Sequence, residues 1–188
     1  MKFSLLLSLG LICLTSACNK SDGEAKKNTI QVFFDLQGYM ESQIEELQKE
    51  QPRVEKRIVL NGEEEGKTVE QLDYKKELQV FLKADINRPA WTDKYAIDSI
   101  IVNKQLTQLR YIAQDDDLKT RRLIITFEEG KVSSIDIDNY NTSAIANQDQ
   151  KLSYDPLLGY TIHSKENVQL SDEQDLLVEV RFLRDLKW

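Results

Sequence analysis

The chain has 188 residues, of which 40% are hydrophobic and 30% are charged, and its formal net charge at pH 7 is −7. This length suffices for one domain with a real hydrophobic core. The acidic balance argues against a nucleic-acid partner or an anionic lipid surface, because both carry negative charge.

The first elements of the chain are those of a secretory signal. Lys2 provides a positive start, and residues 3–14 form an almost wholly apolar run of 12 residues. That run is too short to span a membrane, which takes about 20 apolar residues, and it fits the apolar region of a signal peptide. Small residues at 15–17 lead directly to Cys18. We therefore predict a signal peptide over residues 1–17.

The junction before Cys18 resembles the lipobox of bacterial lipoproteins, in which an aliphatic residue and two small residues precede a cysteine. Thr15 stands where leucine is usual. The resemblance implies cleavage before Cys18, diacylglycerol on its sulfur and an acyl chain such as palmitate on its amine, which together anchor a protein stably to a membrane. Asn19, in place of the aspartate that retains lipoproteins in the inner membrane, implies an outer-membrane location, on the periplasmic face or the cell surface. The alternatives are an ordinary secretory signal and an uncleaved anchor.

The segment 18–31 is interpreted as the lipidated cysteine and a flexible tether, because it is polar and charged with little apolar content. Residues 32–188 are then predicted to form a single globular domain. The two cysteines of the chain are Cys13 and Cys18, so the processed domain would contain no disulfide.

Apolar residues at steps of three and four predict an amphipathic helix over residues 33–50, with Asp35 as its N-cap. An alternating segment over residues 54–60 follows and leads into Asn61-Gly62, the strongest short signal for a β-hairpin. The return strand, which extends to about Val69, is rich in glutamate, as is typical of an edge strand that faces water.

A second amphipathic helix is predicted over residues 74–86, with Asp73 as its N-cap. From residue 95 onward the apolar period changes to two, which predicts short antiparallel strands. We therefore expect an α+β fold, an antiparallel sheet of about six to eight strands with the two N-terminal helices packed on one face. The candidate strands in this part of the chain are 94–103, 106–113, 120–128, 131–138, 150–154, 159–165 and 176–184.

Three groups of residues are candidates for chemistry, and each has a simpler interpretation. His163, the only histidine, lies in an alternating run and is expected on the open face of a strand. The segment 136–141 begins like a calcium loop but has Asn141 where a glycine is needed and Asn147 in place of the final glutamate. The carboxylates at 115–117 are interpreted as a solvated loop. We predict no catalytic residue, no metal site and no cofactor.

The loop between two predicted strands near the C-terminal end is a candidate contact site for a partner. Leu157 and Leu158 lie at the expected turn, and Tyr160 follows them. Exposed apolar side chains at a loop tip favour a protein or lipid partner. The alternative is that these residues fold back over the edge of the sheet.

Four further runs carry a resemblance to a known class of proteins: FDLQGYMESQIEEL, VLNGEEEGKTV, DINRPAW and YDPLLGYTIH. Through them the whole mature chain resembles small Bacteroidetes-type lipoproteins, a class without an established activity, so the resemblance assigns no residue a role. We expect a membrane-anchored envelope lipoprotein that is not an enzyme and that binds another envelope protein or an apolar ligand. Two alternatives stay open: a lipid or lipoprotein carrier with an apolar pocket in a curved sheet, and an envelope hydrolase.

Overall fold

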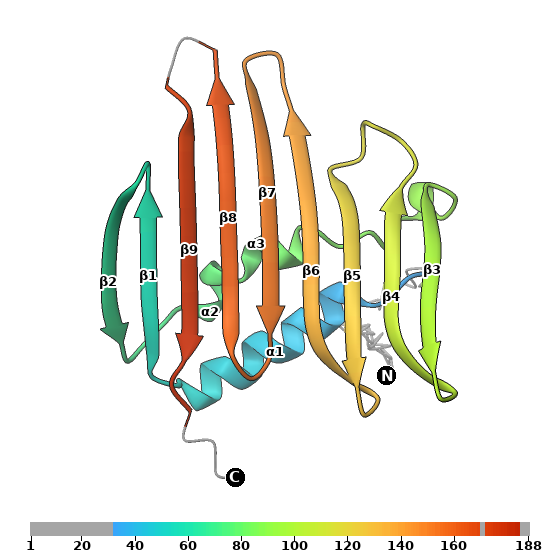
Figure 1. Cartoon of the computed structure of the whole chain (residues 1–188), viewed down its shortest axis with the longest axis horizontal. Helices are drawn as coiled ribbons and strands as arrows, with labels where there is room; N and C mark the ends of the chain where they lie inside the picture. The colour runs from blue at the N-terminus through green and yellow to red at the C-terminus, as the bar shows by residue number, and fades with distance from the viewer. Residues whose placement is uncertain (1–31, 170–171, 185–188) are drawn as a thin grey trace, which may run out of the picture.

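A nine-stranded antiparallel sheet with short helical elements on one side makes up the fold in the computed structural model, which describes residues 32–169 and 172–184 (Figure 1). The predicted signal peptide and tether, with Cys18, lie outside the described residues. The helices are α1 (Leu36–Glu50), α2 (Tyr74–Glu77) and α3 (Gln79–Leu82), followed by a 3-10 turn at Pro89–Trp91. The strands are β1 (Val54–Leu60), β2 (Glu63–Val69), β3 (Tyr95–Val102), β4 (Gln105–Ala113), β5 (Thr120–Glu128), β6 (Lys131–Thr142), β7 (Ala146–Asp155), β8 (Gly159–Val168) and β9 (Gln174–Phe182).

The order of strands across the sheet is β2-β1-β9-β8-β7-β6-β5-β4-β3 (Figure 1). From β3 to β9 each strand pairs with the next strand in the chain. The N-terminal hairpin β1–β2 joins the other end, where Val54 of β1 lies opposite Phe182 and Leu60 lies opposite Leu176 of β9. The predicted α+β class is confirmed, but the expected count of six to eight strands is wrong. The count rises to nine because β1 pairs along its whole length with β9, and β2 pairs with β1 as the edge strand.

The two faces of the sheet differ in character because side chains alternate along each strand. One face carries the core, and there the hydroxyl of Tyr154 donates to Gln43 Oε1 of α1 at 2.9 Å. On the same face the Tyr160 hydroxyl donates to Glu77 Oε2 of α2, also at 2.9 Å. Burial raises the pKa of both tyrosines, so their hydroxyls remain donors. We call this the helix face, and the opposite side the open face.

The core fills the space between the helices and the helix face. Phe33, just before α1, is held between Tyr95 and Tyr111, with its ring edge-on to theirs at 5.7 and 5.5 Å. Each large apolar side chain buried in this way contributes about 1.5–3 kcal/mol. The largest fully buried side chains are Tyr74, Tyr154, Phe81, Leu36, Met40, Leu47, Leu78, Ile86, Leu123, Ile125, Ile135 and Ile137.

The first predicted helix is confirmed together with its N-cap. Asp35 Oδ1 accepts the Gly38 N–H at 3.0 Å, which satisfies one of the free donors of the first turn. The helix ends at Gln51, which takes a left-handed conformation (φ 43°) and donates its N–H to the Leu47 carbonyl. Pro52 follows and prevents continuation.

The second predicted helix, over residues 74–86, is wrong in extent. The chain instead forms the two short helices α2 and α3, which meet at Leu78, where φ is −95° and ψ is 3°. Asp73 caps α2 as predicted, since its Oδ1 accepts the Lys76 N–H at 3.2 Å. Leu78 and Phe81 are both fully buried. Packing against the sheet therefore determines the backbone conformation here. The apolar residues at helical spacing are buried as expected, although the helix that carries them is interrupted.

Candidate functional site

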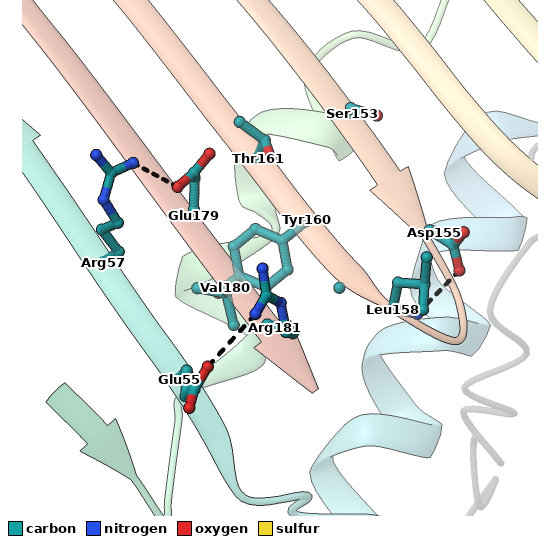
Figure 2. A pocket seen from close by; sticks show the side chains of 11 residues that line it. Glu55, Arg57, Ser153, Asp155, Leu158, Tyr160, Thr161, Glu179, Val180 and Arg181 are labelled. Carbon is teal, nitrogen blue, oxygen red and sulfur yellow. Dashed lines mark hydrogen bonds and ion pairs between the residues drawn. The ribbon is translucent and has the colours of Figure 1, made fainter. Parts of the chain in front are cut away.

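The open face carries two cross-strand rows of charged and polar side chains at its β1–β9–β8–β7 end. The first row places Arg57 beside Glu179, Thr161 and Ser153. The second row places Glu55, Arg181, Gly159 and Asp155 side by side in the same strand order. Between the two rows lies a hollow of about 330 Å³ (Figure 2).

Gly159 lines the hollow and has no side chain. Its φ of +134° is rarely adopted by residues other than glycine, and a Cβ at this position would overlap the carbonyl oxygen of Val180. The backbone of β8 therefore approaches the backbone of β9 closely at this position. Figure 2 shows Arg181 and Glu55 on one side of the gap and Asp155 and Leu158 on the other.

Ion pairs fix the charged rim of the hollow. Arg57 Nη1 donates to Glu179 Oε2 at 2.6 Å, and the same guanidinium binds both carboxylate oxygens of Glu64, on β2, at 2.8 and 3.0 Å. These hydrogen bonds raise the pKa of Arg57 and lower the pKa of Glu64. Arg181 lies 3.7 Å from Glu55. The rim thus presents both signs of charge, in side chains that are 42–76% exposed.

His163 also lies on the open face, as predicted, two residues beyond Thr161 on β8. Its Nε2 lies 2.7 Å from Asp175 Oδ1, and Lys165 Nζ lies 3.3 Å from the other oxygen of that carboxylate. The His163 hydrogen bond is the largest cause of the lowered pKa of Asp175. The group thus joins an imidazole, an ammonium and a carboxylate on the open face.

The acidic segments do not converge within the described parts of the chain. Asp138 lies on the open face and pairs with Arg122 at 2.8 Å, while Asp136 accepts a hydrogen bond from Ser153 at 2.9 Å. In the loop after β4, Asp115 pairs with Lys94. Across residues 32–169 and 172–184, no group of three or more histidine, cysteine or acidic side chains is arranged to hold a metal ion.

The structure separates the three residues predicted to contact a partner. Leu157 and Leu158 lie at the β7–β8 turn and are 61% and 59% exposed. The Asp155 carboxylate fixes this turn by accepting the N–H groups of both leucines at 2.8 and 2.9 Å. Tyr160 is only 3% exposed and lies in the core, so a partner contact is left to the two leucines. They do not fold back over the sheet edge.

A second, larger hollow lies outside the sheet, between α1, the β5–β6 hairpin and the β7–β8 turn. It measures about 1160 Å³ and is open to solvent, and its lining includes Gln43, Glu46, Glu128, Lys131 and Arg184. Apolar side chains contribute to the lining as well, among them Tyr39, Leu47, Val132, Pro156 and Leu157. The lining of this hollow is therefore mixed. The space beneath the helices is occupied by the core described above.

Comparison with protein-family models, with curated proteins and with solved structures finds no match to this chain. Among the helices of residues 32–169 and 172–184, none combines the length and the apolar character needed to cross a membrane. The site must therefore be interpreted from its own geometry.

The hollow was not predicted from the sequence, although the sequence contains a signal for the pairing of β1 with β9, which forms one side of it. Both Glu55-Lys56-Arg57 and Glu179-Val180-Arg181 place a glutamate two residues before an arginine. In an antiparallel pair this spacing sets each glutamate opposite an arginine, which favours pairing. The pattern could have predicted that β1 pairs with β9. The hollow itself is lined by residues of four strands, one of which is distant in sequence from the others, and no local pattern brings all four together.

Proposed function

We propose that this chain is a lipid-anchored protein of the cell envelope that acts by binding another envelope protein through the open face of its sheet. The lipid anchor at Cys18 rests on the lipobox-like junction of the sequence. The observation that carries the binding role is the hollow around Gly159, on a face to which the described helices do not extend. Its mixed-charge rim is complementary to a polar protein surface that also carries both signs of charge.

The charges of the rim argue for a protein partner over an apolar ligand. Glu55, Arg57, Glu179 and Arg181 surround the gap, and an aliphatic ligand there would remove these charges from water without replacing their interactions. A protein surface with acidic and basic side chains can exchange partners with them instead. The same ion pairs explain how the face stays soluble when it is free.

The binding role is tested by affinity capture of the tagged full chain from solubilised envelope, followed by mass spectrometry. A charge-reversed variant, Arg57→Glu with Arg181→Glu, is compared with Lys67→Glu, which makes the same kind of change on the exposed strand β2, away from the rim. We expect a specific protein to co-purify with wild type and with Lys67→Glu and to be lost from the double variant. Equal recovery in all three would refute a role for the open face.

The anchor is tested separately by metabolic labelling with palmitate. We expect Cys18→Ser to abolish labelling and to release the protein from the membrane fraction. Undiminished labelling of this variant would contradict the anchor while leaving the binding experiment valid. The hydrolase alternative has its own readout: a turnover on envelope substrates that His163→Ala removes would favour it over the binding role.

A further inference from the structure

The two edges of the sheet are protected very differently. The edge strand β2 contains Glu63, Glu64, Glu65 and Lys67, and charges of this kind discourage pairing with another strand. The other edge strand, β3, reads YAIDSIIV and carries a single charge. Its side chains are largely β-branched and apolar, which is the composition that favours strand pairing. β3 is therefore the edge at which the sheet is able to extend.

The hydrogen bonds of β3 alternate, and the direction of each can be assigned. The Gln114 N–H donates to the Lys94 carbonyl at 2.9 Å, so Lys94 belongs to a hydrogen-bonded pair with β4. In an antiparallel ladder such pairs recur at every second residue. Ile97, Ser99 and Ile101 consequently direct their N–H and C=O groups away from β4. Among the described strands β3 has no neighbour on that side.

An apolar corner adjoins this edge on the helix face. Ile97 lies opposite Tyr111 of the core, and Ile101 lies opposite Leu106. Ile97 is 54% exposed, Ile101 64% and Leu106 38%. The irregularity between β3 and β4 leaves Thr107 unpaired in β4, so β3 itself continues as a regular strand. The apolar surface thus extends to the outer edge of the sheet.

We propose that β3 is a self-association edge, which pairs antiparallel with β3 of a second copy and extends the sheet across both molecules. The occupant is a second copy because the edge is complementary to itself. The two copies can form hydrogen bonds only if residues whose N–H and C=O groups point away from β4 lie opposite one another. In two such registers, seven of the eight residues of β3 have a partner in the second copy. One register sets Asp98 opposite Asp98 of the second copy, where like charges repel.

The remaining register has its two-fold axis at Ser99. It places Ile97 opposite Ile101 of the second copy on the helix face, so the apolar corners of both molecules become continuous. It places Asp98 opposite Ile100 of the second copy and so separates the two carboxylates. This inference is independent of the open face and of the lipid anchor, because it uses the opposite end of the sheet.

A proline substitution tests the edge without breaking the existing sheet. Because the Ser99 N–H points away from β4, Ser99→Pro removes one donor from the outer edge, a position at which proline is tolerated. Ser99→Ala is the matched control and keeps the donor. In light scattering coupled to size-exclusion chromatography of the full chain in detergent, we expect wild type and Ser99→Ala to dimerise. We expect Ser99→Pro to raise the dimer dissociation constant by at least about tenfold.

A disulfide tests the register and does not depend on the folding of the proline variant. In a background of Cys13→Ser and Cys18→Ser, which removes both native cysteines, Ser99→Cys places two thiols at the axis. The Cα atoms of a hydrogen-bonded pair lie about 5.5 Å apart, within the range that a disulfide spans. We expect oxidation to give a covalent dimer, and Thr68→Cys on β2 to give none.

Several results would overturn the proposal. A wild-type protein that is monomeric would overturn it, both if residues 1–31 of the same chain cover the β3 edge and if the edge stays uncovered. A dimer that Ser99→Pro leaves as tight as wild type would place the interface elsewhere. A dimer whose Ser99→Cys form does not cross-link would rule out the two-fold axis at Ser99. Far-UV circular dichroism of each variant establishes that it has folded.

Discussion

Gly159 is the residue at which one added methyl group should cost the most. An alanine there would require a side chain at φ +134° and would overlap the Val180 carbonyl. The position of this Cβ is fixed by the backbone of β8, and the oxygen it would overlap belongs to the backbone of β9. Neither backbone can move without opening the β8–β9 ladder. We expect Gly159→Ala to lower the free energy of unfolding by at least about 2 kcal/mol. The midpoint of urea denaturation measures this loss.

Gly66 provides the matched control for this change. It lies in the exposed edge strand β2, and a Cβ there meets no atom within 4 Å. The same substitution, Gly66→Ala, should therefore change the free energy of unfolding by no more than about 0.5 kcal/mol. If Gly159→Ala were as harmless as Gly66→Ala, the close approach of β8 to β9 would not be a constraint on this fold.

Asp175 gives the open face a pH dependence of defined sign. Its pKa lies below the ordinary value of 3.8, chiefly because of the hydrogen bond to His163. The folded state therefore binds this proton less tightly than the unfolded state does, and the stabilisation is present above pH 3.8. It is lost as the pH falls through the lower, folded-state pKa. Asp175→Asn should remove this part of the acid-induced loss of stability.

The measurement is the urea midpoint between neutral pH and acid for wild type and Asp175→Asn. We expect wild type to be the more stable at neutral pH and the difference to shrink in acid. His163→Ala should remove part of the same difference, and adding it to Asp175→Asn should have less effect than it has alone. If the urea midpoints of wild type and Asp175→Asn changed in parallel with pH, the contacts of Asp175 with His163 and Lys165 would not stabilise the fold.

At the level of secondary-structure elements, the first turn of α1 shows how a cap can explain an apparently unfavourable residue. Glycine inside a helix usually costs about 1 kcal/mol relative to alanine. At Gly38, however, a Cβ would overlap the carboxylate of Asp35, and that carboxylate is the N-cap. The glycine leaves room for the capping side chain. Its replacement should therefore not bring the usual gain.

A double-mutant cycle tests this coupling. We expect Gly38→Ala to leave stability unchanged or lower in wild type, but to add about 1 kcal/mol in the Asp35→Ala background, where the carboxylate is absent. Thermal or urea unfolding of the four proteins gives the coupling energy. Additive effects would mean that the cap and the glycine act independently.

For the molecule as a whole, most helices and strands could be predicted from the sequence. That the helices pack on one face of the sheet could be predicted as well. The hairpin at Asn61-Gly62 and the caps at Asp35 and Asp73 are local features, and all three are present. Alternation correctly predicted that His163 lies in a strand, on the open face of the sheet. Each of these predictions depends on residues within a few positions of one another, which is why a single sequence suffices for them.

The features that could not be predicted depend on partners distant in sequence. The break at Leu78 follows from packing on the sheet, and the need for glycine at position 159 follows from the position of Val180. Tyr160 is buried because its ring packs against Phe81 and Phe182. The predictions about Cys18 concern a part of the chain outside the described residues and stay predictions.

The position of β1 beside β9 has a consequence for the order in which the chain can fold. Arg57 and Glu179 meet across 122 positions of sequence, whereas every other pair of neighbouring strands is consecutive in the chain. Ribosomes synthesise β1 before, and its partner β9 after, the seven strands that lie between them in the chain. The meander from β3 to β8 can assemble hairpin by hairpin as it emerges, but the first hairpin must wait for β9. A nascent chain that stalls before β9 would leave β1 and β2 detached from the rest of the sheet, because β9 is the strand that joins them to it.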